Sequence, residues 1–185
     1  MKFKVLLIVF TVFAISLFTF AISSCGDSEG AKIDCSKVCA KGKECEKDWT
    51  EDDVKKCETG CNNINEKGYL QDPAVNAINS CYKKDDCSEL QNCLDNSKPS
   101  CKTADYMPYI NAVCDKQISC GTQVTKEKCV EDQKKNIEEQ EAKEPSCLTD
   151  KFYSDFGECI KKVSCENMEN DIIKCMTDMF GVELK

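Results

Sequence analysis

The apolar residues of this chain are concentrated at its N-terminus. The segment from Val5 to Ile22 is apolar apart from three hydroxyl residues, and Lys2 and Lys4 precede it. A positively charged start followed by such a run is typical of an export signal, although its length also approaches that of a membrane-spanning helix. The pattern therefore predicts export. An uncleaved anchor, or plain secretion after cleavage near Ser23, are the alternatives.

Beyond residue 24 the pattern favours helices, because no run of alternating β-branched residues occurs there. Thr50 before Glu51-Asp52-Asp53 resembles a capping box, and Asp72-Pro73 is read as an N-cap followed by proline at N1. Pro108 is expected to delay the start of its helix. We expect an all-α fold without a sheet, built as two tandem disulfide-stapled helical bundles of about four short helices each. The predicted helices with clear limits are 51–61, 72–82, 88–94, 104–116, 126–143, 150–162 and 166–180, the last capped by Gly181.

Cys25 is the first of seventeen cysteines, and the residues before it give it a special place. Ile22-Ser23-Ser24 puts an aliphatic residue at −3 and small residues at −2 and −1. This arrangement resembles the lipobox of bacterial lipoproteins, in which the cysteine is lipidated and becomes the new N-terminus. The resemblance implies a signal peptide over 1–24, an acylated Cys25 with a tether over 25–31, and a lipid anchor in the membrane. Gly26, rather than Asp, favours the outer membrane or cell surface over the inner membrane.

The other sixteen cysteines fall into two sets of eight that share part of their spacing. In each set the second and third cysteines are spaced C-x5-C, and so are the sixth and seventh. Matches that keep their order in this way indicate an internal repeat. The polar, proline-containing segment 95–100 marks the boundary, so we expect cysteine-rich helical repeats at 32–98 and 99–185.

The spacing of some cysteines also suggests bridges. Two C-x3-C pairs, each on one face of a helix, can staple two antiparallel helices twice. This nested arrangement predicts Cys35–Cys61 and Cys39–Cys57 in the first repeat, and Cys101–Cys147 and Cys114–Cys129 in the second. A C-x5-C pair suits a helix end, a turn and a new helix better than one straight helix. The sequence does not choose among the pairings of the remaining disulfide cysteines: Cys45, Cys81, Cys87, Cys93, Cys120, Cys159, Cys165 and Cys175.

Charge and composition exclude several classes of function. Loss of Lys2 and Lys4 with the signal would take the net charge from −8 to −10, and the chain has no arginine. Such a chain is a poor nucleic-acid binder. It also has no histidine and no C-x-x-C, which excludes Ser-His-Asp and Cys-His hydrolases, His-ligated metals and thioredoxin-type redox sites. We expect no catalytic residue, no metal, no cofactor and no nucleic-acid partner, and so no enzyme.

Aromatic residues are sparse beyond the signal, so we expect a thin core in which cross-links replace packing. The clusters 106–109 and 152–156 are interpreted as core, with a partner-binding patch as the alternative. Trp49, alone in a predicted turn, is the candidate contact with a partner. The acidic pairs Asp52-Asp53 and Asp85-Asp86 are interpreted as helix-start caps.

The lipobox together with repeats such as CYKKDDCSELQNCL, from Cys81 to Leu94, resembles cysteine-rich lipoproteins of diderm bacteria. The resemblance implies an exported, disulfide-rich helical protein and carries over no active site. The expected function is that of a membrane-anchored, non-catalytic envelope lipoprotein that presents a rigid helical surface to an unidentified protein or ligand. Two alternatives stay open: a structural coat lipoprotein, and a secreted eukaryotic cysteine-rich protein in which Cys25 remains a thiol.

Overall fold

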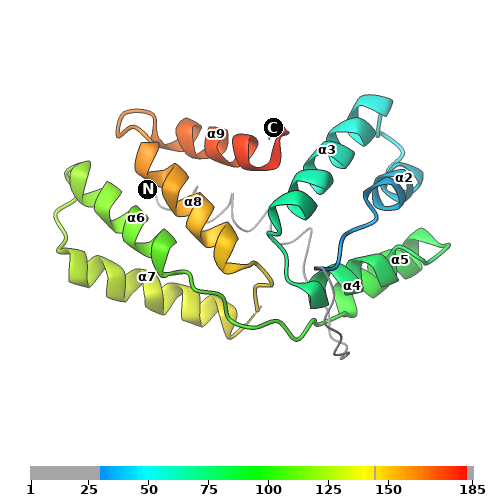
Figure 1. Cartoon of the computed structure of the whole chain (residues 1–185), viewed down its shortest axis with the longest axis horizontal. Coiled ribbons are helices and arrows are strands. Elements are labelled where there is room, and N and C mark those ends of the chain that lie inside the picture. Colours follow the sequence, from blue (N-terminus) through cyan, green and yellow to red (C-terminus); the bar gives the residue numbers. More distant parts are fainter. Residues whose placement is uncertain (1–29, 144, 183–185) are drawn as a thin grey trace.

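The protein is all-helical in the computed structural model, which describes residues 30–143 and 145–182 (Figure 1). The prediction of an all-α fold is confirmed. Within these residues the only β pairing is one isolated antiparallel bridge between Leu70 and Leu148. The first half contains α2 (Cys35–Cys45), α3 (Glu51–Lys67), α4 (Asp72–Cys81) and α5 (Cys87–Asn96). The second half contains α6 (Met107–Ser119), α7 (Lys126–Glu141), α8 (Asp150–Lys162) and α9 (Met168–Phe180).

The helix limits follow local signals in the sequence. Thr50 and Asp53 form the predicted capping box at the start of α3, since the Thr50 hydroxyl accepts the Asp53 N–H and the Asp53 carboxylate accepts the Thr50 N–H. The helix continues past Cys61 and ends at Gly68, which adopts the left-handed conformation with φ of 63°. Gly181 caps α9 in the same conformation, as predicted.

Two predicted helix starts need correction. Asp72 is not the N-cap of α4 but its first residue, and Gln71 occupies the cap position without a side-chain hydrogen bond. The Asp72 carboxylate instead accepts the backbone N–H of Ala31 at 2.8 Å, so a distant segment takes the group that would have capped the helix. The helix predicted from residue 104 begins at Met107, next to Pro108.

The second half has a continuous aromatic core, and the expectation of a thin core is wrong for it. Tyr109, Phe152, Phe156 and Phe180 are all buried, and the Tyr109 and Phe156 rings stack with centroids 5.3 Å apart. Helices α6 and α8 cross closely at Gly157, where a Cβ atom would lie only 2.9 Å from the Pro108 carbonyl oxygen. The first half has two smaller apolar clusters, so it depends more on its cross-links.

The two halves meet along the segment between α3 and α4. The Gln71 N–H donates to the Cys147 carbonyl at 2.9 Å, and the Thr149 N–H donates to the Tyr69 carbonyl at 3.0 Å. Tyr69 itself belongs to the core of the second half. Helix α3 also runs beside α9, where the Asn63 side-chain amide donates to the Phe180 carbonyl at 2.7 Å (Figure 1). The halves are therefore packed together through backbone and side-chain contacts.

Candidate functional site

The most extensive chemical feature of the described residues is their disulfide framework. Eight bridges use all sixteen cysteines from Cys35 to Cys175, with Cα–Cα distances of 5.3–5.8 Å. Four of them join the residues that the nested arrangement pairs: Cys35–Cys61, Cys39–Cys57, Cys101–Cys147 and Cys114–Cys129. In the second half Cys101 precedes α6 and Cys147 follows α7, so this bridge joins two segments that lie outside the helices.

The four bridges that the sequence left open complete one topology shared by both halves. They are Cys45–Cys87, Cys81–Cys93, Cys120–Cys165 and Cys159–Cys175. When the eight cysteines of each half are numbered in order, both halves pair first with fifth, second with fourth, third with seventh and sixth with eighth. Eight cysteines allow 105 pairings, so this agreement is highly specific.

The first C-x5-C pair does not lie across a turn, and that prediction is wrong there. Cys39 and Cys45 both belong to α2. Six residues of helix turn through about 600°, so the two thiols point in different directions. Cys39 therefore reaches α3 through Cys57, while Cys45 reaches the start of α5 through Cys87. The expected helix end and new helix occur instead between Cys81, which ends α4, and the cysteine that opens α5.

The bridges differ in how far they are covered. Cys39, Cys114 and Cys147 are fully buried, and Cys81 is 1% exposed. Two bridges contain no buried cysteine: Cys45–Cys87, in which both residues are half-buried, and Cys120–Cys165, in which Cys165 is exposed. These two occupy the equivalent third-to-seventh position in their halves. The most accessible cross-links are thus the same in both halves.

An extended segment at residues 31–34, here called the N-terminal strap, is clamped to α3 and α4 through its backbone. The Asn65 side chain accepts the Ile33 N–H at 2.8 Å and donates to the Ile33 carbonyl at 2.9 Å. The Asn79 side chain accepts the Asp34 N–H at 2.9 Å and donates to the Lys32 carbonyl at 2.8 Å. Sequence reasoning missed this strap, since single asparagines within helices give no signal of a remote backbone partner.

Trp49 lies in the turn between α2 and α3, as predicted, but it is not isolated. It is half-buried, and its indole packs against α2 at Gly42, where a Cβ atom would lie 3.0 Å from the ring. An ion pair between Lys43 and Glu51 closes the same turn. The Lys43 ammonium lowers the pKa of the Glu51 carboxyl by hydrogen bonding and charge. Trp49 as a whole is not fully buried, so part of the residue is available for contact.

The other candidate residues have structural roles. Tyr109, Phe152 and Phe156 are core residues, which agrees with the interpretation of both aromatic clusters as core. The carboxylate of Asp86 accepts a hydrogen bond from the Ser88 hydroxyl and caps α5 by accepting the N–H groups of Ser88 and Glu89. These hydrogen bonds, that of the hydroxyl first, lower the pKa of Asp86. The capping interpretation is thus confirmed for Asp53 and Asp86.

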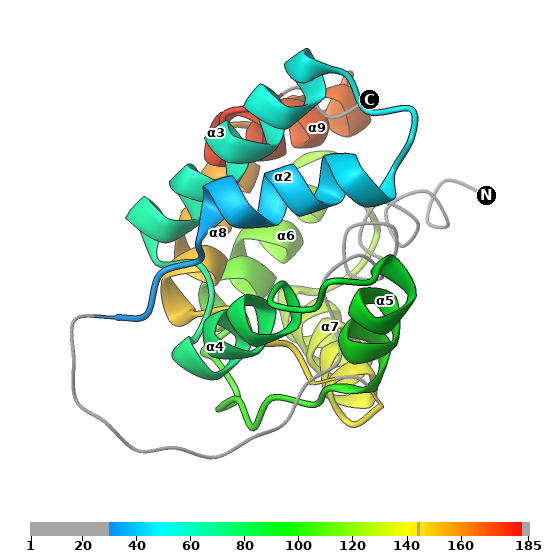
Figure 2. The same ribbon diagram turned by 90° about the vertical axis from the view of Figure 1, so that its right-hand side faces the viewer.

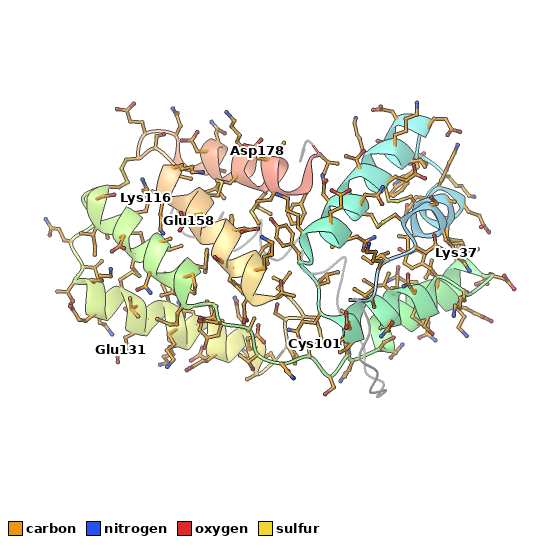
Figure 3. All side chains as sticks on the ribbon, viewed as in Figure 1. Lys37, Cys101, Lys116, Glu131, Glu158 and Asp178 are labelled. Carbon is orange, nitrogen blue, oxygen red and sulfur yellow. A yellow bond between two sulfur atoms is a disulfide. The ribbon has the colours of Figure 1, made fainter. Side chains whose placement is uncertain are left out.

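Charged side chains of the described residues lie at the surface. No polar or charged side chain is buried among them, and Figure 3 shows labelled groups such as Glu131 and Asp178 on the outside of the helices. Within the exposed α7, Lys128, Lys134 and Lys135 pair with carboxylates of the same helix, as Lys128 does with Asp132 at 2.7 Å, whereas Lys126 pairs with Asp115 of α6. No cluster of three or more Cys, Asp or Glu residues in the described part of the chain is arranged to hold a metal ion.

The predicted signal peptide and Cys25 lie outside the described residues. Among the helices of residues 30–143 and 145–182, none combines the length and hydropathy needed to cross a bilayer. Comparison of the chain with protein-family models, with curated proteins and with solved structures finds no significant match.

Proposed function

We propose that the protein is a lipid-anchored envelope lipoprotein whose helical part is a non-catalytic interaction module. The observation that supports the anchor is the completeness of the disulfide framework. The sixteen cysteines after Cys25 are all paired with one another, so none is left within the chain to bridge to Cys25. Its position after Ile22-Ser23-Ser24 is the position of the acylated cysteine in a lipobox.

The shared bridge topology supports an origin by duplication. Each half has four helices and the same order of pairing, although the halves differ in how their helices pack. The bridges close segments of 12 to 46 residues. By the chain-entropy model, bridges over loops of that size contribute on the order of 3–4 kcal/mol each. A surface held in this way is pre-organised, so binding a partner costs little conformational entropy.

Trp49 is the residue through which we propose that the module contacts its partner. Its indole is supported from behind by Gly42 and held in place by the closed turn, yet it is only half-buried. Tryptophan is enriched among the residues that dominate the binding energy of protein interfaces. The partner expected for such a surface is a protein or a ligand with an apolar group that covers the indole.

The anchor is tested by the intact mass of the mature protein purified from membranes. Two or three acyl chains on an N-terminal Cys25 would support it. A free thiol at Cys25, or a disulfide from it to a second chain, would favour the secreted alternative. A mass that includes residues 1–24 would show an uncleaved anchor.

The interaction is tested by cross-linking the anchored protein in intact envelopes and comparing two variants. W49A should lose the captured partner, while I118A should keep it, since Ile118 is an exposed apolar residue at the end of α6. Equal capture by both variants would remove Trp49 from the interface. Absence of any saturable partner would favour the structural coat alternative.

A further inference from the structure

We infer that the side of the fold that carries the N-terminal strap faces the lipid bilayer, and that the turn with Trp49 faces away from it. This orientation depends on the proposed acylation of Cys25. It arises from two observations: the structure fixes the position of the strap, and the sequence places few residues between the strap and Cys25.

The strap is part of the fold from Ala31 onward. The Asp72 carboxylate holds the Ala31 N–H, and Asn65 and Asn79 hold the next three residues through four hydrogen bonds. Ile33 is buried, in a cluster with Val75 and Ile78 of α4. These five hydrogen bonds and the burial of the isoleucine together hold the strap against α3 and α4. The strap therefore does not lengthen the tether.

The remaining tether is short. Only residues 26–30 lie between Cys25 and Ala31. Six Cα steps span at most about 20 Å when fully extended. A fold of this size is roughly 40 Å across, by the usual scaling of the radius of gyration. Ala31 therefore stays within about 20 Å of the headgroups, and the hemisphere opposite the strap cannot touch the membrane.

The structure shows which surfaces these are. In Figure 2 the strap, the end of α3 and the start of α4 lie together at the left, and the turn between α2 and α3 lies at the upper right. Two exposed lysines lie on the strap side: Lys32 within the strap, and Lys67 two residues after Asn65. Trp49, the only tryptophan of the chain, lies in the opposite turn. A partner would then reach the indole without approaching the lipid.

Energy transfer from a single tryptophan to a headgroup-labelled lipid tests this orientation. The full-length acylated protein, with its native Trp49, and the double variant W49F/K67W would each be reconstituted in phosphatidylcholine vesicles containing a trace of dansyl lipid. We expect transfer to be several-fold greater from the indole at position 67 than from Trp49. Equal transfer from both positions, or greater transfer from Trp49, would overturn the orientation.

A pair of tether variants shows whether the tether and strap cause the difference. Ten Gly and Ser residues inserted between Asp27 and Ser28 should reduce the difference between the two positions and leave the circular dichroism unchanged. N65A/N79A should reduce it too, since it removes four of the five hydrogen bonds that hold the strap, while the Cys35–Cys61 bridge keeps the following residues in place. A difference in energy transfer that persists in both tether variants would contradict the role of tether length.

Intact masses of the same samples separate the proposed acylation from the proposed orientation. An unacylated Cys25 overturns both proposals, whereas equal transfer from acylated protein overturns only the orientation.

Discussion

The hydroxyl of Tyr69 donates a hydrogen bond to Oδ2 of Asp155 at 3.0 Å, which links the end of α3 to α8. The same carboxylate oxygen accepts a hydrogen bond from Lys151 at 2.8 Å. Tyr69 is 1% exposed, and its ring meets Phe152 and Phe180 edge-on, with centroids 5.5 and 6.1 Å away. A residue of the first half thus completes the core of the second half, and the stability of the two halves is coupled.

This coupling predicts unequal effects of two substitutions at one position. Tyr69→Ala should lower the free energy of unfolding by about 3–5 kcal/mol, because it removes a ring from a closed core. Tyr69→Phe keeps the ring and loses only the hydrogen bond, so it should cost about 1 kcal/mol. Denaturant unfolding of both variants measures the difference. Similar costs for the two would show that the ring does not fill the core.

The Asp155 contact also predicts a dependence on pH. Burial by itself raises the pKa of Asp155, but the hydrogen bonds from Lys151 and Tyr69, together with the positive charges of Lys151 and Lys67, outweigh it, so the net shift of the pKa is downward. A carboxyl whose pKa is lower in the folded state stabilises the fold above its unfolded pKa, near 4, and this contribution is lost as the pH falls through the folded pKa. Stability should therefore drop between about pH 5 and pH 2, and Asp155→Asn should drop less over that range. Parallel pH profiles for the two proteins would contradict this role of Asp155.

Two buried glycines on helices provide a matched test of packing. At Gly157 a Cβ atom would lie 2.9 Å from the backbone oxygen of Pro108, which cannot move without separating α6 from α8. Gly157→Ala should therefore destabilise the fold by about 1–3 kcal/mol. At Gly60 the nearest atoms are 3.5 Å away on the Val182 side chain, so Gly60→Ala should be neutral or stabilise by up to about 1 kcal/mol. Thermal unfolding distinguishes the two, and equal shifts in Tm would refute close packing at Gly157.

Features encoded within a few residues were predictable from the sequence. The capping box at Thr50, the caps at Asp86 and Gly181 and the helices themselves follow from local patterns. The nested bridges could also be predicted, because each of the C-x3-C pairs that begin at Cys35 and Cys57 places two thiols on one helix face.

Features that join remote segments were not predictable in this way. The pairing of Cys45 with Cys87 depends on where α5 lies relative to α2, and no spacing specifies that. Asp72 had the features of a helix cap, yet its carboxylate is taken by Ala31, 41 residues earlier. No pattern in the sequence predicts that the indole of Trp49 packs against Gly42. Each of these depends on tertiary packing, which overrides local preference.

The unequal covering of the bridges predicts the order in which they open. A thiolate must reach a sulfur atom to attack it, so access limits the rate of exchange while the fold persists. Limited treatment of the native protein with a small thiol reductant, followed by alkylation and peptide mapping, should label Cys120 and Cys165 first and Cys45 and Cys87 next. The buried Cys114–Cys129 bridge should open last, and with it the helical circular dichroism should fall.

The first product of this reduction should stay folded. Without Cys120–Cys165, α9 is still held to α8 by Cys159–Cys175 and by buried side chains such as Met176 and Phe180. A control in concentrated guanidinium removes the protection that burial gives, so all bridges should there react without this order. If Cys114 and Cys129 were labelled before Cys165 in the native protein, access would not be what sets the order. If the helical circular dichroism were lost when the first bridge opens, the stability of the second half would depend on that bridge and not on the aromatic core.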